Sequence, residues 1–190
     1  MGSAASAQSP APQSALAPST RPSAPEGQMD VYVSGTAGYH TYRIPSLIVT
    51  KKGTILAFCE GRKNSRSDTG DIDLLMKRSA DGGKTWSDAM LVWNDKGNTC
   101  GNPCPVVDQG TGVIWLLMTW NRGDDNEAAI KAGTGKDTRR VFVSSSADDG
   151  ATWTRPVDIT ASVKHKDWRW YATGPGVGIQ LQRGPHKGRL

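Results

Sequence analysis

One eight-residue pattern occurs twice in this chain, 67 positions apart. The first copy, Ser79–Trp86, reads SADGGKTW, and the second, Ser146–Trp153, reads SADDGATW, so both fit S-x-D-x-G-x-T-W. Each copy follows one short apolar run and precedes another, which marks it as a turn between two strands. A turn duplicated in the same context predicts a repeated β unit, and this restricts the chain to repeat architectures built from strands.

The fixed positions of this pattern, called the box below, have separate physical roles. The Asp of each box is expected to accept backbone N–H bonds across its own turn, and the Gly supplies positive φ at no steric cost. The Trp lies where the next strand starts and is expected to pack back over the turn. These positions indicate a fold and say little about chemistry. They are Ser79, Asp81, Gly83, Trp86, Ser146, Asp148, Gly150 and Trp153.

Strand-like runs alternate with Gly-, Asn- and Asp-rich turns elsewhere, and no 3.6-residue period appears. The expected strands are 44–50, 54–59, 72–78 and 89–93, then 105–108, 113–120, 140–145 and 153–159, and finally 177–182. Four antiparallel strands per unit, with a box between the third and fourth, are typical of propeller blades. We therefore predict an all-β propeller, of which this chain supplies two blades and the start of a third. The short run 31–33 is expected to complete the last blade of the ring.

The alternation of strand direction sorts the connections onto two faces. If the first strand of each blade runs downward, both boxes lie on the lower face. The upper face then receives the starts of the inner strands, at Arg43, Asn102 and Gly174, and the long connections 61–71 and 121–138. Long loops on a rigid scaffold commonly carry function, so the functional site is expected on the upper face.

Residues 1–28 differ in composition from the rest, with seven Ala, six Ser, five Pro and no aromatic residue. Such a stretch buries too little apolar surface to offset its ordering entropy. We interpret 1–28 as a disordered linker, or a processed or engineered start, and 29–190 as the folded part. The linker lacks the basic and apolar regions of a signal peptide. No apolar run approaches the roughly 20 residues that span a bilayer.

The net charge of +5 lies in the folded part, because Arg21 and Glu26 cancel in the linker. It fits either an anionic ligand or a mildly basic surface. A Lys/Arg stripe with stacking aromatics is missing, which argues against nucleic acid. The odd count of cysteines, Cys59, Cys100 and Cys104, argues against a disulfide framework, and a lone C-x3-C argues against zinc. Buried free thiols are predicted.

Several sequence motifs lie at or near the expected upper face. Residues 42–45 read YRIP, residues 58–62 read FCEGR, and residues 172–181 read ATGPGVGIQL. With Asp68 and the first box, in this order and spacing, they resemble bacterial-type exo-sialidases (neuraminidases) of the six-bladed Asp-box propeller superfamily. The resemblance covers residues 39–190. The box is shared with many proteins, whereas YRIP, the arginine of FCEGR and the following aspartate make the resemblance specific.

The resemblance implies roles for two charged residues. Arg43 would be one of three arginines that grip the sialic acid carboxylate, which suits a guanidinium because it forms two charge-assisted bonds and keeps its proton. Asp68 would be the general acid/base that protonates the leaving oxygen and then activates water. Asp71 and Asp73 are the alternatives for that role, and only the family spacing favours Asp68 over them.

Further contacts are implied for the sugar ring. Arg62 would contact the O4 region, and Asn102, where relatives often carry Asp before Pro, would make a weaker O4 contact. Trp120 would either line the apolar pocket for the N-acetyl methyl group or simply pack at the end of a strand. Three residues of the first long connection are expected only to shape it. They are Ser65, Arg66 and Thr69.

The resemblance also implies a Tyr nucleophile assisted by a Glu, an accepted exception to the two-carboxylate scheme, and two more arginines. All are expected in later blades, beyond Leu190, and Tyr39, Tyr42 and Tyr171 lie in the wrong blades to be the nucleophile. No cofactor is implied. Metal-ligand spacing is missing among the histidines, which are His40, His165 and His186.

We therefore expect the N-terminal part of an exo-α-sialidase domain that hydrolyses terminal sialic acids with retention of configuration. The expected partners are sialylated glycoproteins, glycolipids or oligosaccharides, and the remaining blades. Such glycans lie outside the cell, so a secreted or periplasmic enzyme is expected, and the 190-residue chain alone is expected to be inactive. The alternative is a non-catalytic carbohydrate-binding propeller. Other Asp-box glycosidases are disfavoured by Arg43.

Overall fold

Eight strands and two short helices make up the part of the chain that the computed structural model describes, residues 27–190. The strands of the first unit are β1 (Thr41–Val49), β2 (Ile55–Arg62), β3 (Ile72–Ser79) and β4 (Met90–Trp93), and those of the second are β5 (Thr99–Val107), β6 (Ile114–Asn121), β7 (Arg140–Ser146) and β8 (Val157–Asp158). The linker predicted over 1–28 lies outside the described residues except for its last two.

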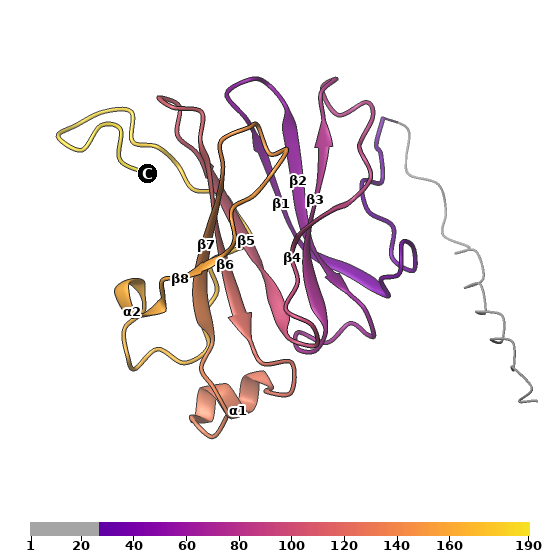
Figure 1. The fold of residues 1–190 in the computed structure, drawn as a ribbon, viewed down its shortest axis with the longest axis vertical. Coiled ribbons are helices and arrows are strands. Elements are labelled where there is room, and N and C mark those ends of the chain that lie inside the picture. Colours follow the sequence, from indigo (N-terminus) through magenta and orange to yellow (C-terminus); the bar gives the residue numbers. More distant parts are fainter. Residues whose placement is uncertain (1–26) are drawn as a thin grey trace, which may run out of the picture.

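Each unit is an antiparallel sheet in which consecutive strands pair, β1 to β4 in the first and β5 to β8 in the second. One parallel pairing, Ile72 with Thr99, joins the two units. Figure 1 shows the two sheets standing face to face. The predicted all-β fold and its four-stranded, blade-like units are therefore confirmed, with the box between the third and fourth strand of each unit.

The hydrophobic core lies between the two units. It is formed by alternate side chains of neighbouring strands, because every second residue of a strand points to the same face. The buried members are Leu56, Phe58, Leu74, Met76, Cys100, Val107, Ile114, Leu116 and Met118. The Trp153 ring of the second box meets the Phe58 ring of the first unit edge to face, with centroids 5.7 Å apart. The units are thus held together mainly by apolar burial.

Both boxes form the expected turn. In the first, Asp81 Oδ1 accepts the backbone N–H of Thr85 at 2.9 Å and Oδ2 accepts the Thr85 hydroxyl at 2.6 Å. Asp148 and Thr152 repeat these bonds at 2.8 and 2.5 Å. The box glycines have φ of +88° and +79°. Trp86 packs back over its turn and donates to the Gly83 carbonyl, whereas the Trp of the second box packs across the units instead.

The box aspartates predict an acid-dependent stability. Bonds from the Thr85 and Thr152 hydroxyls, with other donors, lower the pKa of Asp81 and Asp148 to about 2. A carboxyl whose pKa is lower in the folded state stabilises the fold above its unfolded pKa of about 4. We expect the D81N/D148N variant to have a lower Tm at pH 6. This deficit should shrink as the pH falls from about 4 to about 2, and a constant deficit down to pH 2 would contradict the assignment.

Three strand predictions need correction. The run 177–182 is not a strand, because only the Gly178 N–H to Pro105 carbonyl bond joins its backbone to β5 among the described residues. The run 31–33 is not a strand either, and it is attached through the Tyr32 hydroxyl to the Ala57 carbonyl. The run 153–159 shortens to β8, since Trp153 turns into the core.

Two other elements differ from the sequence expectation. β5 begins six residues earlier than 105, because a bulge lets it continue past Pro103. The long connection 121–138 contains α1 (Glu127–Ala132), which Asn126 caps by accepting the Ala129 N–H, and α2 (Thr160–Val163) follows β8. Neither helix has the length or apolar character to cross a membrane.

The cysteines are free, as predicted, with Cys59 and Cys100 buried and Cys104 half-buried. Burial raises the pKa of Cys59 to about 12, so this thiol keeps its proton at neutral pH.

Candidate active site

The two ends of the strands carry different features, as the alternation predicted. Along β3, Ile72 lies opposite Arg62 of β2, whereas Ser79, which starts the first box, lies opposite Ile55 at the other end. The second box likewise starts opposite Ile114, at the end of β6 that lies away from α1. Figure 1 shows α1 and the β2–β3 connection at the same end of the molecule. The boxes and the candidate site therefore lie at opposite ends.

The inner strands β1 and β5 share an unusual bulge at the site end. The pairing shifts between Arg43 and Ser46 in β1 and between Gly101 and Cys104 in β5. Inside each bulge one non-glycine residue has positive φ, +57° at Ile44 and +52° at Asn102, and a proline follows each. A β-branched residue in this region is strained, and such strain clusters at functional sites. The β1 bulge re-aims the strand at Arg43.

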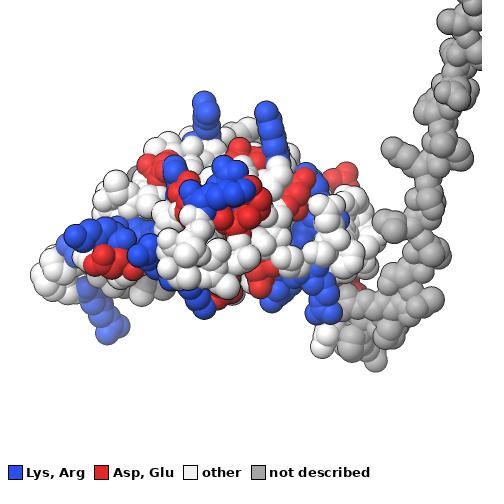
Figure 2. Space-filling view, turned by 90° about the horizontal axis from the view of Figure 1, so that it is seen from below, with Lys and Arg blue, Asp and Glu red and all other residues white. Residues whose placement is uncertain are grey.

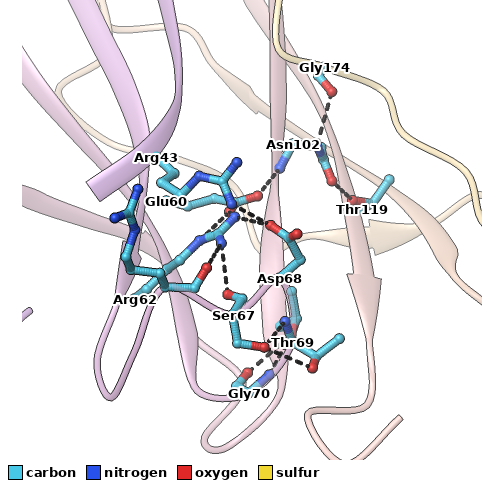
Figure 3. A network of polar contacts seen from close by, with 12 residues as sticks. Arg43, Glu60, Arg62, Ser67, Asp68, Thr69, Gly70, Asn102, Thr119 and Gly174 are labelled. Atoms are coloured by element: carbon cyan, nitrogen blue, oxygen red, sulfur yellow. Dashed lines mark hydrogen bonds and ion pairs between the residues drawn. The ribbon is translucent and has the colours of Figure 1, made fainter. Parts of the chain in front are cut away.

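Asp68 lies between two guanidinium groups. Its Oδ1 is 2.8 Å from Arg43 Nη1 and 2.8 Å from Arg62 Nη2 (Figure 3). The Asp68 side chain is 52% exposed and that of Arg43 is 41% exposed, whereas that of Arg62 is only 3% exposed. The site therefore presents a carboxylate and one cation to solvent, and it holds the second cation beneath them. This arrangement can bind an anion and transfer a proton side by side.

Arg62 is fully engaged inside the protein. Its Nε and Nη2 donate to Glu60 Oε2 at 3.1 and 2.6 Å, and Nη2 also meets Asp68. Its Nη1 donates to the carbonyls of Arg66 and Ser67, both at 2.7 Å. These acceptors account for the five N–H groups of a guanidinium. In this structure each of these N–H groups has an acceptor within the protein, and the expected O4 contact of Arg62 stays a prediction.

Asn102 is engaged in the same way. Its Nδ2 donates to the Gly174 carbonyl at 3.0 Å, while its Oδ1 accepts from the Thr119 hydroxyl at 2.8 Å and from Arg139 Nη2 at 2.5 Å. Its backbone N–H donates to Glu60 Oε1 at 3.1 Å. The structure brings Asn102 to the cluster, as the face assignment predicted. Its side-chain amide bonds within the second unit and to Gly174, whereas its backbone N–H reaches Glu60 of the first unit. The expected O4 contact stays a prediction.

Hydrogen bonds shape the connection that carries Asp68. The Ser65 hydroxyl accepts the Ser67 N–H at 3.1 Å, and the Ser67 hydroxyl accepts the Thr69 N–H at 3.2 Å. The buried Thr99 hydroxyl of β5 accepts the Gly70 N–H at 3.2 Å and donates to the Gly70 carbonyl at 3.0 Å. The expected shaping role of this segment is thus observed, with Arg66 contributing its carbonyl.

The alternative acids are placed differently from Asp68. Asp73 is 2% exposed, accepts from the Tyr39 hydroxyl at 2.7 Å and from Asn94 Nδ2, and lies 3.2 Å from Lys63 Nζ. Asp71 also pairs with Lys63, at 3.0 Å. Burial and the bond to Asp73 raise the pKa of Tyr39, so this phenol stays protonated. Asp73 is therefore a structural anchor, and Asp68 is the more accessible carboxyl.

Trp120 does not join the cluster. Its ring packs against the core between the units, and its Nε1 donates to Asp95 Oδ2 at 2.7 Å. The adjacent Thr119 points to the opposite face and reaches Asn102. These contacts favour the packing interpretation of Trp120, although its ring also lines an open cavity with Trp93 and Arg140. A role of Trp120 in a substrate pocket stays a prediction.

Sequence reasoning missed two buried charges near the site. Glu60 was read only as part of FCEGR, although its spacing of two from Arg62 on one strand puts both side chains on the same face. Arg139 is 4% exposed, and its guanidinium lies 3.9 Å from the Trp170 ring centroid. Burial lowers the pKa of Arg139 to about 10, and nearby Glu60 and Asp68 act in the opposite direction. No sequence motif marked this residue.

Charges of both signs surround the site. Figure 2 looks onto the lower end of the view in Figure 1 and shows Lys and Arg intermixed with Asp and Glu. Within residues 27–190, no group of three His, Cys, Asp or Glu side chains is placed to hold a metal ion.

Comparisons with known proteins identify the family of this chain. A family described as "BNR repeat-like domain" matches residues 53–190. An exo-alpha-sialidase of Aspergillus fumigatus is 36% identical over 170 residues, which cover 77% of this chain and 40% of the relative. A sialidase of Bacteroides fragilis is 36% identical over 156 residues, covering 75% and 29%. The chain thus spans less than half the length of these relatives.

Solved structures give the same result. The Hadza microbial sialidase Hz136 is 30% identical, with a TM-score of 0.68 over 78% of this chain and 32% of that protein. A leech intramolecular trans-sialidase is 15% identical with a TM-score of 0.72, over 84% and 41%, and this likeness concerns the fold alone. The chain belongs to the BNR repeat-like domain family and is a homologue of the sialidases within it.

Proposed function

We propose that the protein is a retaining exo-α-sialidase whose first blade supplies Arg43 and Asp68 to an active site within a six-bladed ring. The observation that carries this proposal is the solvent-facing pair of Arg43 and Asp68, 2.8 Å apart, on a rigid, hydrogen-bonded support. Arg43 supplies the fork that a carboxylate requires. Asp68 supplies a proton beside it. The sialidase homologues make a sialoside the substrate that combines both requirements.

The proposed reaction has two steps. In the first, protonated Asp68 gives its proton to the glycosidic oxygen as the bond to the anomeric carbon breaks. The aglycone leaves as an alcohol, and the Tyr oxygen expected from a later blade bonds to that carbon while the Tyr proton passes to its assisting Glu. In the second, water attacks the same carbon, its proton passes to the Asp68 carboxylate, and the Tyr oxygen departs as it takes its proton back from the Glu. Two inversions give net retention.

The substrates and location follow from this chemistry. Terminal sialic acids occur on glycoproteins, glycolipids and oligosaccharides, so these are the proposed substrates. Because such glycans lie outside the cell, we also propose a secreted or periplasmic enzyme.

The proposal is tested with the full-length protein and an aryl α-sialoside followed by proton NMR. We expect cleavage with the α-anomer of free sialic acid appearing first. The separately purified chain of residues 1–190 should show no turnover, because the Tyr, its Glu and two arginines are expected in later blades. Sialoside binding by the full-length protein without cleavage would overturn the proposal in favour of a carbohydrate-binding propeller. Turnover by residues 1–190 would show that this chain supplies the missing groups.

A further inference from the structure

Glu60 is a buried carboxylate that the proposed reaction does not use. Its side chain is 3% exposed, and both oxygens are occupied. Oε2 accepts from Arg62 Nε and Nη2, while Oε1 accepts the backbone N–H of Asn102 in the second unit (Figure 3). A buried charge of this kind is costly unless it is paired and hydrogen-bonded. Glu60 meets both conditions, and it does so directly beneath the exposed carboxyl of Asp68.

The partner of Glu60 holds the segment that carries the proposed acid. Arg62 grips the carbonyls of Arg66 and Ser67, at 2.7 Å each, and reaches Asp68 itself at 2.8 Å. Two N–H groups of Arg62 point at one oxygen of Glu60, and this pair of bonds fixes the plane of the guanidinium. The three contacts to residues 66–68 require that plane. Without that anchor, Arg62 would keep its charge but lose the geometry that places the Asp68 segment.

The second unit leaves room for this anchor. Gly101 occupies in the β5 bulge the position that Arg43 occupies in the β1 bulge. A Cβ at Gly101 would lie 2.2 Å from Glu60 Oε1, so a side chain there is incompatible with the observed carboxylate. The positive φ of Asn102 belongs to the same bulge and turns its N–H onto Glu60. The groups that hold Asp68 in place therefore come from both units: Glu60 and Arg62 from the first, and the Asn102 N–H from the second.

We propose that Glu60 is a positioning residue for the reaction, acting through Arg62 to hold Asp68 at the leaving oxygen. This inference rests on the proposed function, since it assigns Asp68 as the acid. Arg62 is then the residue that holds the acid in place. Glu60 touches no substrate, so it affects proton donation and leaves the carboxylate grip of Arg43 in place.

Glu60→Gln in the full-length enzyme is the first test. Gln keeps the shape but presents an N–H₂ group and no charge to Arg62. We expect kcat on an alkyl sialoside, whose leaving group needs a proton, to fall roughly 10²-fold, the effect of misplacing a catalytic group by about 1 Å. The rate on an aryl sialoside should change far less, and KM should stay close to that of the wild type. Arg62→Lys, which keeps the cation but loses the fork, should show the same selectivity.

Asp73→Asn is the matched control. Asp73 is also a buried carboxylate in the same sheet, paired with Gly61 in the register and bonded to Tyr39 and Asn94. Its loss should reduce stability without changing the ratio of alkyl to aryl rates. Amide hydrogen exchange gives a readout that needs no activity. Exchange over residues 66–70, which Asp73 does not contact through its partner Lys63, should accelerate selectively in Glu60→Gln and Arg62→Lys, and not in Asp73→Asn.

The outcomes separate this inference from the proposed function. Equal losses on both substrates in Glu60→Gln, or unchanged exchange over 66–70, would mean that Glu60 is only part of a structural ion pair and would overturn the inference. If Asp68→Asn left kcat/KM unchanged on both the alkyl and the aryl sialoside, the proposed function would fail. The exchange result would then decide separately whether Glu60 holds the connection that carries Asp68.

Discussion

Replacing Asp68 by Asn is expected to lower the rate on alkyl sialosides by roughly 10²–10⁴-fold, the usual contribution of general acid–base catalysis. Asn keeps the size of the side chain and one acceptor for the two arginines, but it has no proton to donate. Aryl sialosides have leaving groups that hardly need protonation, so their first step should lose much less. The measurement is kcat/KM for an alkyl and an aryl sialoside with the full-length variant.

The structure supplies a sharp control for this variant. Asp71 lies three residues away in sequence and pairs with Lys63. Asp71→Asn should therefore leave the ratio of alkyl to aryl rates as in the wild type. Equal losses on both substrates in Asp68→Asn, or a selective loss in Asp71→Asn, would assign the acid to a different residue.

Replacing Arg43 by Ala is expected to reduce kcat/KM by roughly 10²–10⁴-fold on alkyl and aryl sialosides alike. Two hydrogen bonds to a charged group contribute about 3–6 kcal/mol together, and each 1.4 kcal/mol corresponds to about tenfold. The loss does not depend on the leaving group, because the substrate carboxylate is present in both substrates. The expected signature is thus the opposite of that for Asp68→Asn, and one pair of substrates distinguishes them.

Arg78→Ala is the matched control for Arg43. Arg78 is a partly exposed arginine of the same unit, but it pairs with Asp149 at the box end of the sheet, at 3.4 Å. Its loss should leave kcat/KM unchanged on both substrates. If the Arg43→Ala enzyme kept the wild-type kcat/KM, the proposed binding of the substrate carboxylate by Arg43 would be wrong.

The resting contact between Arg43 and Asp68 has a consequence for the order of events. In the described structure Arg43 Nη1 donates to Asp68 Oδ1. Under the proposed function, we expect a substrate carboxylate bound by this guanidinium to replace Asp68 as its acceptor and so to free Asp68 on one side. Arg62 would keep its contact with Asp68. The position of Asp68 during proton transfer would then depend on how Glu60 fixes Arg62.

The sequence alone determined the repeat, most of the strands and the end of the sheet at which Arg43 and Asp68 lie. The box is a local structure: its Asp, Thr and Gly make their bonds within eight residues, so two copies identified two equivalent strand pairs. Strand direction alternates along an antiparallel sheet, so the ends that carry Arg43 and Asp68 followed from the order of the runs. The motifs YRIP and FCEGR then added the family.

Tertiary structure alone decided how the buried polar groups share their bonds. Whether Arg62 faces a sugar or the protein depends on the path of residues 63–71, which brings two carbonyls to its Nη1. The direction of the Asn102 amide depends on Gly174, Thr119 and Arg139, which are distant in sequence. A side chain with several donors has many possible partners, and only the folded chain selects among them. For that reason the sequence identified the charged residues of the site, whereas it did not predict that Glu60 and Arg62 hold Asp68 in place.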